Sequence, residues 1–384
     1  MSEAGKISIL VPVYRDGACL GKLLGQLSES RLWEVIVVAD SPSSETLEVL
    51  EKYGKKIKYI ISDRRLGKAR SLNKALRYAS GKILVFIDAD HYLENTKQLE
   101  DFVKQFDRKQ EIIDFKKVVD KENLLSRLVY YDYVGFAIVN WLSAKLASRC
   151  IGLNGSAFAI KRNVFEDLGG FPENEISEDL GLAFKAYTRG VKFKFEEKVV
   201  VRLKAPSSWR EWFKQRWRWG HGFALWFKHN YKELLRATIR DPKIILIPAF
   251  FFYPSLTAFL VTAFLPENRM LAGLFLILFL MVSRIRFLVP LLFATYFSIA
   301  FVRGMGASTI SLALSSLVFF LLARRLGYNF NPLTFAVYFY FYSSLWLLII
   351  LISLIRVFLL KKTEIKDWPT KPSRIVSINM NFQI

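Results

Sequence analysis

The chain has 384 residues, of which 52% are hydrophobic and 23% charged, with a formal net charge of +21. That length allows two modules, since single domains usually hold about 100 to 200 residues. No Asp or Glu occurs between Glu267 and Glu364, which excludes an ordinary soluble domain over that stretch. Lys and Arg gather at the edges of apolar runs, which favours a lipid surface and argues against a nucleic-acid partner.

Cys19 and Cys150 are the only cysteines, too few for a disulfide framework or a zinc site. The part of the chain before the apolar third is therefore expected in the cytosol. The first residues, Met1 to Lys6, are polar and precede a strand-like run, so we expect no cleavable signal peptide.

Four short apolar runs rich in β-branched residues come first in the chain: Ile7 to Val13, Val35 to Ala39, Ile57 to Ile61 and Ile83 to Ile87. Stretches of helical character separate them, and this alternation predicts an α/β fold with a parallel sheet. Parallel sheets bind ligands outside the carboxyl ends of their strands. The loops after Val13, Ala39 and Ile87 are therefore where we expect the chemistry.

The first two of these loops contain an aromatic residue and a carboxylate. Pro12 and Tyr14 end the first run, and Asp40 follows the second. Tyr14 could stack on a nucleobase while Asp40 bonds its edge or its ribose. A packed Tyr and a helix-capping Asp are the structural alternatives.

The segment Arg64 to Arg70 brings four cations, Lys68 and Arg70 among them, around Gly67 at a predicted helix start. Cations at a helix N-terminus suit a diphosphate, although a solvated charge run is the usual alternative. The glycine spacing is not that of a phosphate-binding P-loop.

Asp88 and Asp90 follow the fourth apolar run, separated by Ala89. Two carboxylates in an extended turn can converge on one hard divalent cation, which in turn can neutralise a diphosphate leaving group. An acidic loop tip without a ligand is the alternative, but the position after a buried strand favours a metal site.

Two segments beyond this turn differ in character. Glu122 to Arg149 has an apolar centre too short between charges to span a membrane, which favours a core helix over a membrane-facing one. Ser207 to Arg240 holds five of the nine Trp residues among Arg and Lys, a mixture that suits a headgroup interface.

The uncharged run from Ile244 to Leu265 has 22 residues, enough to cross a hydrocarbon core of about 30 Å as a helix. Further apolar runs follow at Met270 to Ser283, Phe287 to Val302, Ala307 to Ala323 and Leu333 to Leu360. Basic residues before Ile244 and after Leu360 both favour the cytosol, which requires an even number of spans, whereas the runs number five. We expect three or four spans, with the remainder in the interface or folded against other helices.

Taken in order, these motifs resemble the family 2 glycosyltransferases, whose catalytic domain is a nucleotide-sugar-binding α/β fold called GT-A. The resemblance covers most of the first 220 residues. It extends to Gly152 to Ile160 with Gly169-Gly170-Phe171, to Ser177-Glu178-Asp179 and to Gln215-Arg216-Trp217-Arg218-Trp219. The last two look like the Thr-Glu-Asp and Gln-x-x-Arg-Trp signatures of membrane-embedded members such as cellulose, chitin and hyaluronan synthases.

This chain departs from the family pattern at two positions. Ser177 stands where the signature has Thr, and Ala39 stands where relatives commonly carry the first Asp of an Asp-Asp pair. Asp40 would then have to serve the nucleobase alone, which puts the identity of the nucleotide in doubt.

The resemblance implies a single inverting displacement, in which an acceptor oxygen attacks the anomeric carbon as a nucleoside diphosphate leaves. It implies that Asp179 is the catalytic base and that Gln215, Arg218 and Trp219 line the acceptor end and the diphosphate. The remaining implied roles are nucleotide-sugar binding by Pro12, Tyr14, Asp40, Lys68, Arg70 and Asp88, binding of Mn²⁺ or Mg²⁺ by Asp88 and Asp90, and acceptor binding by Asn154, Gly155, Ser156 and Glu178.

The acceptor and donor follow from a narrower resemblance, to the archaeal membrane mannosyltransferases of N-glycan assembly. It implies GDP-mannose as donor and a dolichyl-phosphate-linked acceptor. Because a sugar hydroxyl needs a base and an ionised lipid phosphate does not, Asp179 slightly favours a lipid-linked sugar. A processive polysaccharide synthase of the cellulose or hyaluronan type is the alternative enzyme. A membrane-tethered sugar-nucleotide-binding protein and a transporter are the alternatives without catalysis.

We therefore expect a GT-A catalytic domain over 1–206, amphipathic interface helices that complete the active site over 207–243, a transmembrane domain over 244–362 and a tail over 363–384. The protein would be a multi-pass cell-membrane protein with a cytosolic catalytic domain. Its expected partners are a nucleotide sugar, a lipid-linked acceptor and membrane lipid, with no nucleic acid.

Overall fold

The computed structural model describes residues 7–17, 19–63, 65–106, 109–149, 152–257, 261, 277–278, 281, 288–361 and 375–379. The chain divides into two compact units, the first made of Met1–Ile247 with Leu348–Ile384 and the second of Pro248–Leu347. All the strands that the structure describes belong to the first unit.

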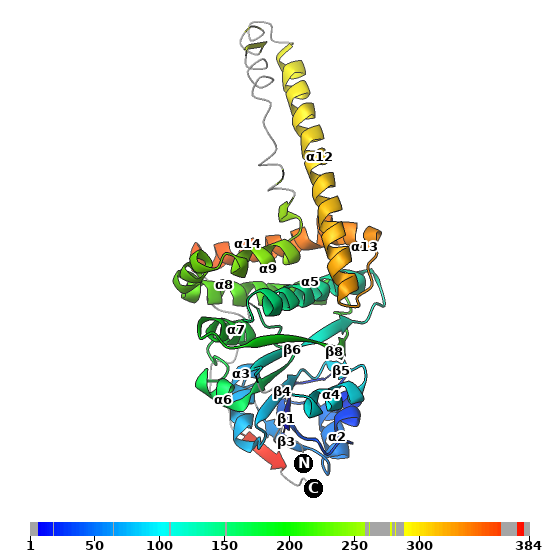
Figure 1. Ribbon diagram of the computed structural model, residues 1–384, viewed down its shortest axis with the longest axis vertical. Coiled ribbons are helices and arrows are strands. Elements are labelled where there is room, and N and C mark those ends of the chain that lie inside the picture. Colours follow the sequence, from blue (N-terminus) through cyan, green and yellow to red (C-terminus); the bar gives the residue numbers. More distant parts are fainter. Residues whose placement is uncertain are drawn as a thin grey trace. The chain divides into compact units, whose positions relative to one another are not determined.

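One sheet organises the first unit, with its strands in the order β5-β8-β6-β7-β4-β1-β2-β3-β9 (Figure 1). The strands are β1 (Ile7–Tyr14), β2 (Trp33–Asp40), β3 (Lys58–Ser62), β4 (Ile83–Ile87), β5 (His91–Leu93), β6 (Ile112–Val119), β7 (Ala157–Lys161), β8 (Phe193–Leu203) and β9 (Ile375–Asn379). The four predicted strands are β1 to β4, which pair in parallel as expected.

The sheet as a whole is mixed, which corrects the prediction of a parallel sheet. Strand β7 lies antiparallel between β4 and β6, and β9 pairs antiparallel with β3. The strands after β4 contain buried charged residues such as Lys116 and Glu196, so continuous apolar runs do not reveal them in the sequence.

The helices of the first unit are α1 (Leu20–Leu27), α2 (Ser44–Tyr53), α3 (Lys68–Ala75), α4 (Thr96–Lys104), α5 (Leu124–Leu146), α6 (Arg162–Asp167), α7 (Glu178–Thr188) and α8 (Trp209–Arg240), with a 3₁₀ turn at Leu76–Tyr78. A capping box between Asn123 and Ser126 starts α5, and the Ser208 hydroxyl accepts the Glu211 amide at the start of α8. Most side chains of α5 are buried, which confirms the predicted core helix.

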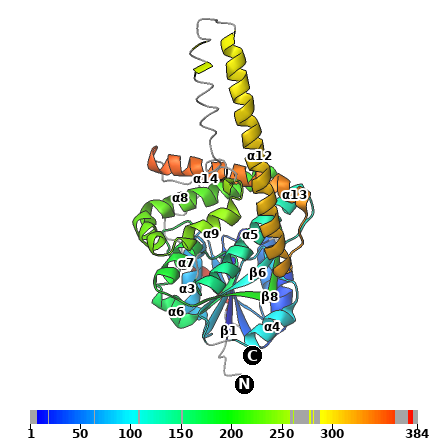
Figure 2. The same ribbon diagram turned by 45° about the horizontal axis from the view of Figure 1, so that its top comes forward.

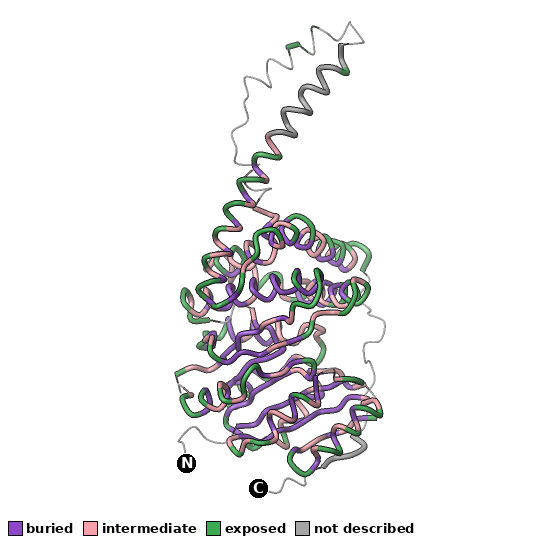
Figure 3. The backbone as a smooth tube through the Cα atoms, turned by 90° about the vertical axis from the view of Figure 1, so that its right-hand side faces the viewer, coloured by how far each residue is buried: buried purple, intermediate pink, exposed green. Residues whose placement is uncertain are grey.

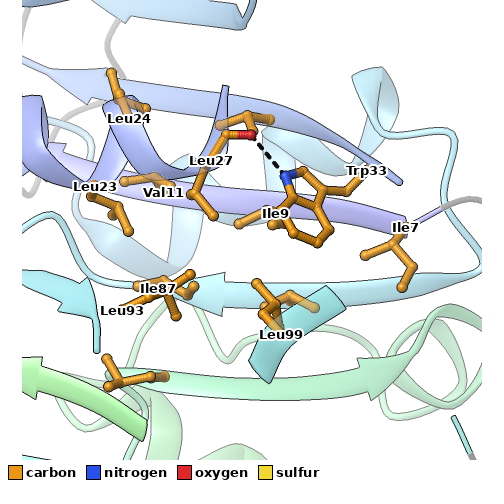
Figure 4. Close-up of a cluster of buried hydrophobic side chains, with 14 of the residues drawn as sticks. Ile7, Ile9, Val11, Leu23, Leu24, Leu27, Trp33, Ile87, Leu93 and Leu99 are labelled. Atoms are coloured by element: carbon orange, nitrogen blue, oxygen red, sulfur yellow. Dashed lines mark hydrogen bonds between the residues drawn. The ribbon is translucent and has the colours of Figure 1, made fainter. Parts of the chain in front are cut away.

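Two apolar cores lie on opposite faces of the sheet, because successive side chains of a strand point to opposite faces. Figure 4 shows the first core, in which Ile9 and Val11 of β1 pack with Leu23 and Leu27 of α1. The indole of Trp33 closes this core, its Nε1 donating to the Leu27 carbonyl oxygen at 2.9 Å.

The second core joins the other face of the strands to α3, α6 and α7, which cover that face together, whereas α4 lies on the opposite face (Figure 2). Phe86 of β4 is stacked on Phe158 of β7 and meets Phe171 edge-on. The strands between the two layers are almost entirely buried (Figure 3). The functional residues must therefore lie at the ends of the strands.

Among the described residues, Arg303–Arg325 and Pro332–Phe358 are helical stretches that are long and apolar enough to cross a membrane, judged by length and composition alone. They belong to α12 (Leu288–Arg325) and to the run of α13 (Pro332–Val337), a π-helical turn (Tyr338–Tyr342) and α14 (Ser343–Phe358). A shorter apolar helix, α9 (Lys243–Phe252), follows α8.

The bounds of these helices differ from those of the predicted apolar segments. The runs predicted at Phe287 to Val302 and Ala307 to Ala323 are joined in one helix, α12, because a charged side chain at Arg303 does not interrupt backbone hydrogen bonding. The run Ile244 to Leu265 is not one helix in its described part, since α9 ends at Phe252 and Pro254 follows. Most of the run at Met270 to Ser283 and most of the tail at 363–384 lie outside the described residues.

Candidate active site

The carboxyl ends of β1, β2 and β4 meet at one edge of the sheet, as predicted. Tyr14 and Asp40 end neighbouring strands and are register partners, and Asp88 directly follows β4. The Asp88 amide donates to the Ser156 carbonyl oxygen at 2.8 Å, which ties the acidic turn to the loop before β7. The predicted loops therefore converge with a loop that follows almost seventy residues later in the chain.

Lys68 contacts three different segments at this edge of the sheet. Its ammonium lies 2.7 Å from one carboxylate oxygen of Asp88 and 2.9 Å from the other. It also donates to the Gly155 carbonyl oxygen at 3.2 Å and lies 3.7 Å from Glu178 Oε1. Burial opposes the charge, but Asp88 and Glu178 outweigh it and hold the pKa of Lys68 above its ordinary value. A single cation thus joins three distant segments.

Glu178 begins α7 beside this cation, and its side chain is 12% exposed. Burial raises the pKa of Glu178 to about 7; Lys68 opposes that rise, while Asp179 and Asp88 add to it. Burial, together with the neighbouring carboxylates, outweighs the attraction of Lys68, so the pKa of Glu178 is raised.

Asp179 is the next residue of α7, and both of its carboxylate oxygens accept backbone amides. Oδ1 accepts from Leu180 at 2.8 Å and Oδ2 from Gly155 at 3.1 Å. These two donors fix the direction of the carboxylate. A carboxylate held in one direction next to the Lys68 cluster is suited to accept a proton.

Asp90 differs from Asp88 in its surroundings. Its side chain is 58% exposed, and its Oδ1 lies 2.6 Å from Nδ1 of the buried His91. Burial raises the pKa of Asp90, but His91 outweighs this and lowers it to about 2. Asp90 therefore combines a lowered pKa with a side chain that is more than half exposed.

The fit of a divalent cation to Asp88 and Asp90 depends on the number of oxygen ligands. Within the described ranges, no three His, Cys, Asp or Glu side chains converge to hold a metal. Mg²⁺-type ions are commonly bound by one or two carboxylates, with substrate phosphates and water as the other ligands. Asp90 and Asp88 supply the two carboxylates of that mode, and because both oxygens of Asp88 face Lys68, an ion bound there would share Asp88 with that ammonium.

Tyr14 and Asp40 form the other end of this edge. Tyr14 is 40% exposed, and the Arg65 guanidinium lies 4.3 Å from its ring centroid. Asp40 is buried, and its two oxygens accept the amides of Leu66 and Gly67 at 2.6 and 2.8 Å. Burial raises the pKa of Asp40, and these amides oppose the rise. Asp40 therefore fixes the loop that presents Arg65 and Lys68, and Pro12 lies half-buried near the end of β1.

The predicted cluster of four cations is dispersed. Lys68 faces Asp88 and Arg65 faces Tyr14, whereas Arg70 Nε lies 3.3 Å from Glu173 Oε2. Residues two apart on a helix point to different sides, which explains the separation of Lys68 from Arg70. Arg64 lies outside the described residues.

The loop before β7 supplies a backbone amide and a backbone carbonyl to the site. Asn154 Oδ1 accepts the Ser156 hydroxyl at 2.7 Å and the Ser156 amide at 3.3 Å, so these two buried side chains brace each other. Gly155 between them donates to Asp179 and accepts from Lys68. The predicted acceptor residues Asn154, Gly155 and Ser156 thus lie together beside Glu178.

Helix α8 comes close to this cluster at Gly222, where an added Cβ would lie 2.6 Å from Ser177 Oγ. One turn before, Gln215 and Trp219 are half-buried and Arg218 is exposed. The predicted Gln-x-x-Arg-Trp residues are therefore carried by a helix that packs on the turn holding Glu178 and Asp179.

Arg216 is the buried cation of this motif, and its pairing was not predicted. Its Nη2 lies 2.7 Å from Asp132 Oδ2 on α5. The signal was present in the sequence, since Trp212, Arg216 and Gly220 recur every four residues and so share one helix face, which is the buried one. His91 and the ion pair of Lys117 with Asp114 in β6 were also missed.

Comparisons with known proteins bear on the family and the fold. Residues 8–169 match the family model described as Glycosyl transferase family 2. The probable glycosyltransferase YdaM of Bacillus subtilis is 25% identical over 274 residues, which cover 66% of this chain and 63% of that protein. A poly-beta-1,6-N-acetyl-D-glucosamine synthase of Staphylococcus epidermidis is 23% identical over 250 residues, 62% of this chain and 59% of that protein. The matches span less than two thirds of the length of these curated relatives.

Among solved structures, the mannosyltransferase PcManGT from Pyrobaculum calidifontis, in complex with GDP-Man and Mn²⁺, has a TM-score of 0.51 and 20% identity, covering 80% of this chain and 87% of that chain. This likeness concerns the fold. The fold is the predicted GT-A fold, a mixed, Rossmann-like α/β domain, and the apolar helices that follow it are compatible with a membrane anchor.

Proposed function

We propose, from the match of residues 8–169 to glycosyl transferase family 2, that this chain transfers a sugar from a nucleoside diphosphate sugar to an acceptor at a membrane surface. The observation that carries the proposal is the convergence of Lys68, Asp88, Glu178 and Asp179 at the carboxyl edge of the sheet. That cluster combines a cation for a diphosphate with a carboxylate for proton transfer.

The reaction is a single inverting displacement. An acceptor oxygen forms a bond to the anomeric carbon while the bond from that carbon to the diphosphate oxygen breaks, and the electron pair leaves with the nucleoside diphosphate. Asp179, oriented by the amides of Gly155 and Leu180, accepts the proton of the acceptor hydroxyl. Lys68 stabilises the negative charge that develops on the diphosphate, and Arg218, exposed on α8, adds a second cation.

Asp88 and Asp90 are the residues that would hold Mn²⁺ or Mg²⁺. Such an ion supplies neutralisation of the diphosphate when it is bound. Tyr14 offers a ring face to the nucleobase, and Pro12 precedes it in β1. Asp40 holds the loop of Leu66 and Gly67, and Arg70 pairs with Glu173.

We propose GDP-mannose as the donor and a dolichyl-phosphate-linked sugar as the acceptor, in N-glycan biosynthesis, with Asn154, Gly155, Ser156, Glu178, Gln215 and Trp219 around the acceptor. The resemblance of the motifs supports this choice, and a protein of the same fold has been solved with GDP-Man. A processive polysaccharide synthase is the second candidate, supported by the poly-beta-1,6-N-acetyl-D-glucosamine synthases among the relatives.

The proposed location is the cell membrane, with several spans and the catalytic domain in the cytosol. We also propose domain boundaries at residues 206, 243 and 362. Strand β9 supports an even number of spans, because it returns to pair with β3 of the catalytic sheet after the apolar helices. The two ends of the apolar region must then lie on the same side of the membrane.

A donor screen with product analysis tests the proposal. The full chain in nanodiscs is given GDP-mannose, UDP-N-acetylglucosamine or UDP-glucose, with a lipid extract and with Mn²⁺, Mg²⁺ or EDTA. We expect release of GDP and a lipid-linked product heavier by one hexose. A ladder of oligomers from UDP-N-acetylglucosamine would support the synthase, and donor binding without release of any nucleotide would contradict catalysis.

A further inference from the structure

A buried ion pair links two helices beside the candidate active site. Arg216 of α8 and Asp132 of α5 approach to 2.7 Å, and their side chains are 1% and 4% exposed. Removing two charges from water costs so much that a buried pair seldom increases stability over apolar residues of the same volume. The pair is therefore better explained by what it positions than by stability.

Besides Asp132, Arg216 contacts the ring of Trp219. The guanidinium carbon lies 4.3 Å from the Trp219 ring centroid, closer than the 5.8 Å to Trp212 on the same helix. A planar guanidinium stacks on an indole, and this attraction is strongest where water is excluded. The tilt of the Trp219 ring is thus coupled to the position of the Arg216 side chain.

Asp132 in turn belongs to a fixed part of the fold. Helix α5 packs on β6, and its Asn140 Nδ2 donates to Asp114 Oδ2 of that strand at 2.8 Å. Asp114 is itself paired with Lys117, so α5 is tied to the sheet by buried polar contacts. The sheet therefore fixes the position of α5, and α5 fixes the position of the Arg216 side chain through Asp132.

The neighbourhood of this pair reaches the acidic turn. Tyr133, next to Asp132, has a pKa raised chiefly by burial, while Arg216 opposes the rise and Asp90, Asp132 and Asp88 add to it. Charges on α8 and on the Asp88 turn thus act on one phenol. On the same helix as Arg216, Gly222 packs against Ser177, where an added Cβ would lie 2.6 Å from the Ser177 hydroxyl, so the helix that carries the pair adjoins the turn of Glu178 and Asp179.

We propose that Arg216, held by Asp132, is a positioning residue that sets the orientation of Trp219 for binding of the acceptor. This inference rests on the proposed function, in which Trp219 contacts the acceptor sugar. A flat, fixed indole can stack on the apolar face of a sugar ring, whereas a tilting one loses that contact.

Arg216→Lys is the first test variant, since it keeps the charge opposite Asp132 but removes the planar group on Trp219. In the full chain in nanodiscs, we expect the acceptor KM to rise about tenfold while nucleotide-sugar binding stays unchanged. Arg210→Lys, the same change at an exposed position of α8, is the matched control. In a Trp219→Ala background, Arg216→Lys should have no further effect.

A spectroscopic measurement tests the inference without activity. With 5-fluorotryptophan incorporated, Trp219→Phe assigns the Trp219 fluorine resonance, which should shift and broaden in Arg216→Lys and stay unchanged in Arg210→Lys. If Arg216→Lys does not fold, Asp132→Asn with Arg216→Gln removes both buried charges together and should move the same resonance. An unmoved Trp219 resonance, or equal losses of acceptor and donor binding, would overturn the inference. A wild-type chain that releases no nucleotide would contradict the proposed function instead.

Discussion

The amide of Gly155 donates to the Asp179 carboxylate at 3.1 Å, and no larger residue fits at this contact, because a Cβ on residue 155 would lie 2.4 Å from the Asp179 Cβ. Gly155→Ala should therefore displace Asp179. We expect kcat to fall about 100-fold, since a shift of about 1 Å at a reacting group has this effect. Nucleotide release and thermal unfolding measure the change. Gly152→Ala, where an added Cβ meets nothing within 4 Å, is the control and should keep the wild-type rate.

Glu178 gives the stability of the chain a predictable pH dependence. Its folded pKa of about 7 lies above the ordinary value of 4.5, so the folded chain binds a proton more tightly than the unfolded chain. Glu178 therefore costs stability as pH rises from 4.5 through 7, by at most about 3 kcal/mol. Glu178→Gln should unfold at a higher temperature than wild type at pH 8 and at the same temperature at pH 5. A lower unfolding temperature at pH 8 would show that its attraction to Lys68 dominates.

Glu34 has the opposite effect on the pH dependence of stability. Burial raises the pKa of Glu34, but Lys58 and Ser8 outweigh it and lower the pKa to about 2. Its contribution to stability is present above pH 4.5 and is lost as pH falls toward 2. Glu34→Gln should lower the free energy of unfolding by about 3 kcal/mol at pH 7, with the difference shrinking at pH 3. Glu48→Gln, at an exposed position of α2, is the control. Equal free energies of unfolding for the two variants would show that the contacts of Glu34 with Lys58 and Ser8 do not stabilise the fold.

The strand pattern near the N-terminus was predictable because apolar, β-branched runs mark strands that are buried on both faces. Tyr14, Asp40 and Asp88 could be placed at one edge for the same reason. The grouping of Lys68 with Gly155 and Glu178 could not be predicted, since no local pattern records contacts across such long stretches of chain.

Other differences between the predicted and the observed site arise because composition does not show which polar residues are buried. Asp40 has the chemistry of a nucleobase ligand, but its carboxylate holds the amides of Leu66 and Gly67, which only the folded loop shows. The mixture of Trp with Arg and Lys over Ser207 to Arg240 suggested a headgroup interface, yet the helix period places Arg216 on the buried face of α8.

Strand β9 makes the topology testable. Because residues 375–379 pair with β3, both ends of the apolar region should lie on the side of the membrane that holds the catalytic domain. Reporter proteins fused to the N-terminus and to the C-terminus should both be active in the cytosol of a bacterial host. A C-terminal fusion to alkaline phosphatase that is active outside the cytosol would show an odd number of spans.

The central claim is that Asp179 accepts the acceptor proton within the Lys68 cluster. The most direct test compares kcat for Asp179→Asn with that of wild type, at saturating GDP-mannose and lipid acceptor, by release of GDP. Loss of the base should lower kcat by about 10² to 10⁴ with donor binding unchanged, whereas Asp101→Asn on the exposed side of α4 should have no effect. Wild-type turnover in Asp179→Asn would contradict the account.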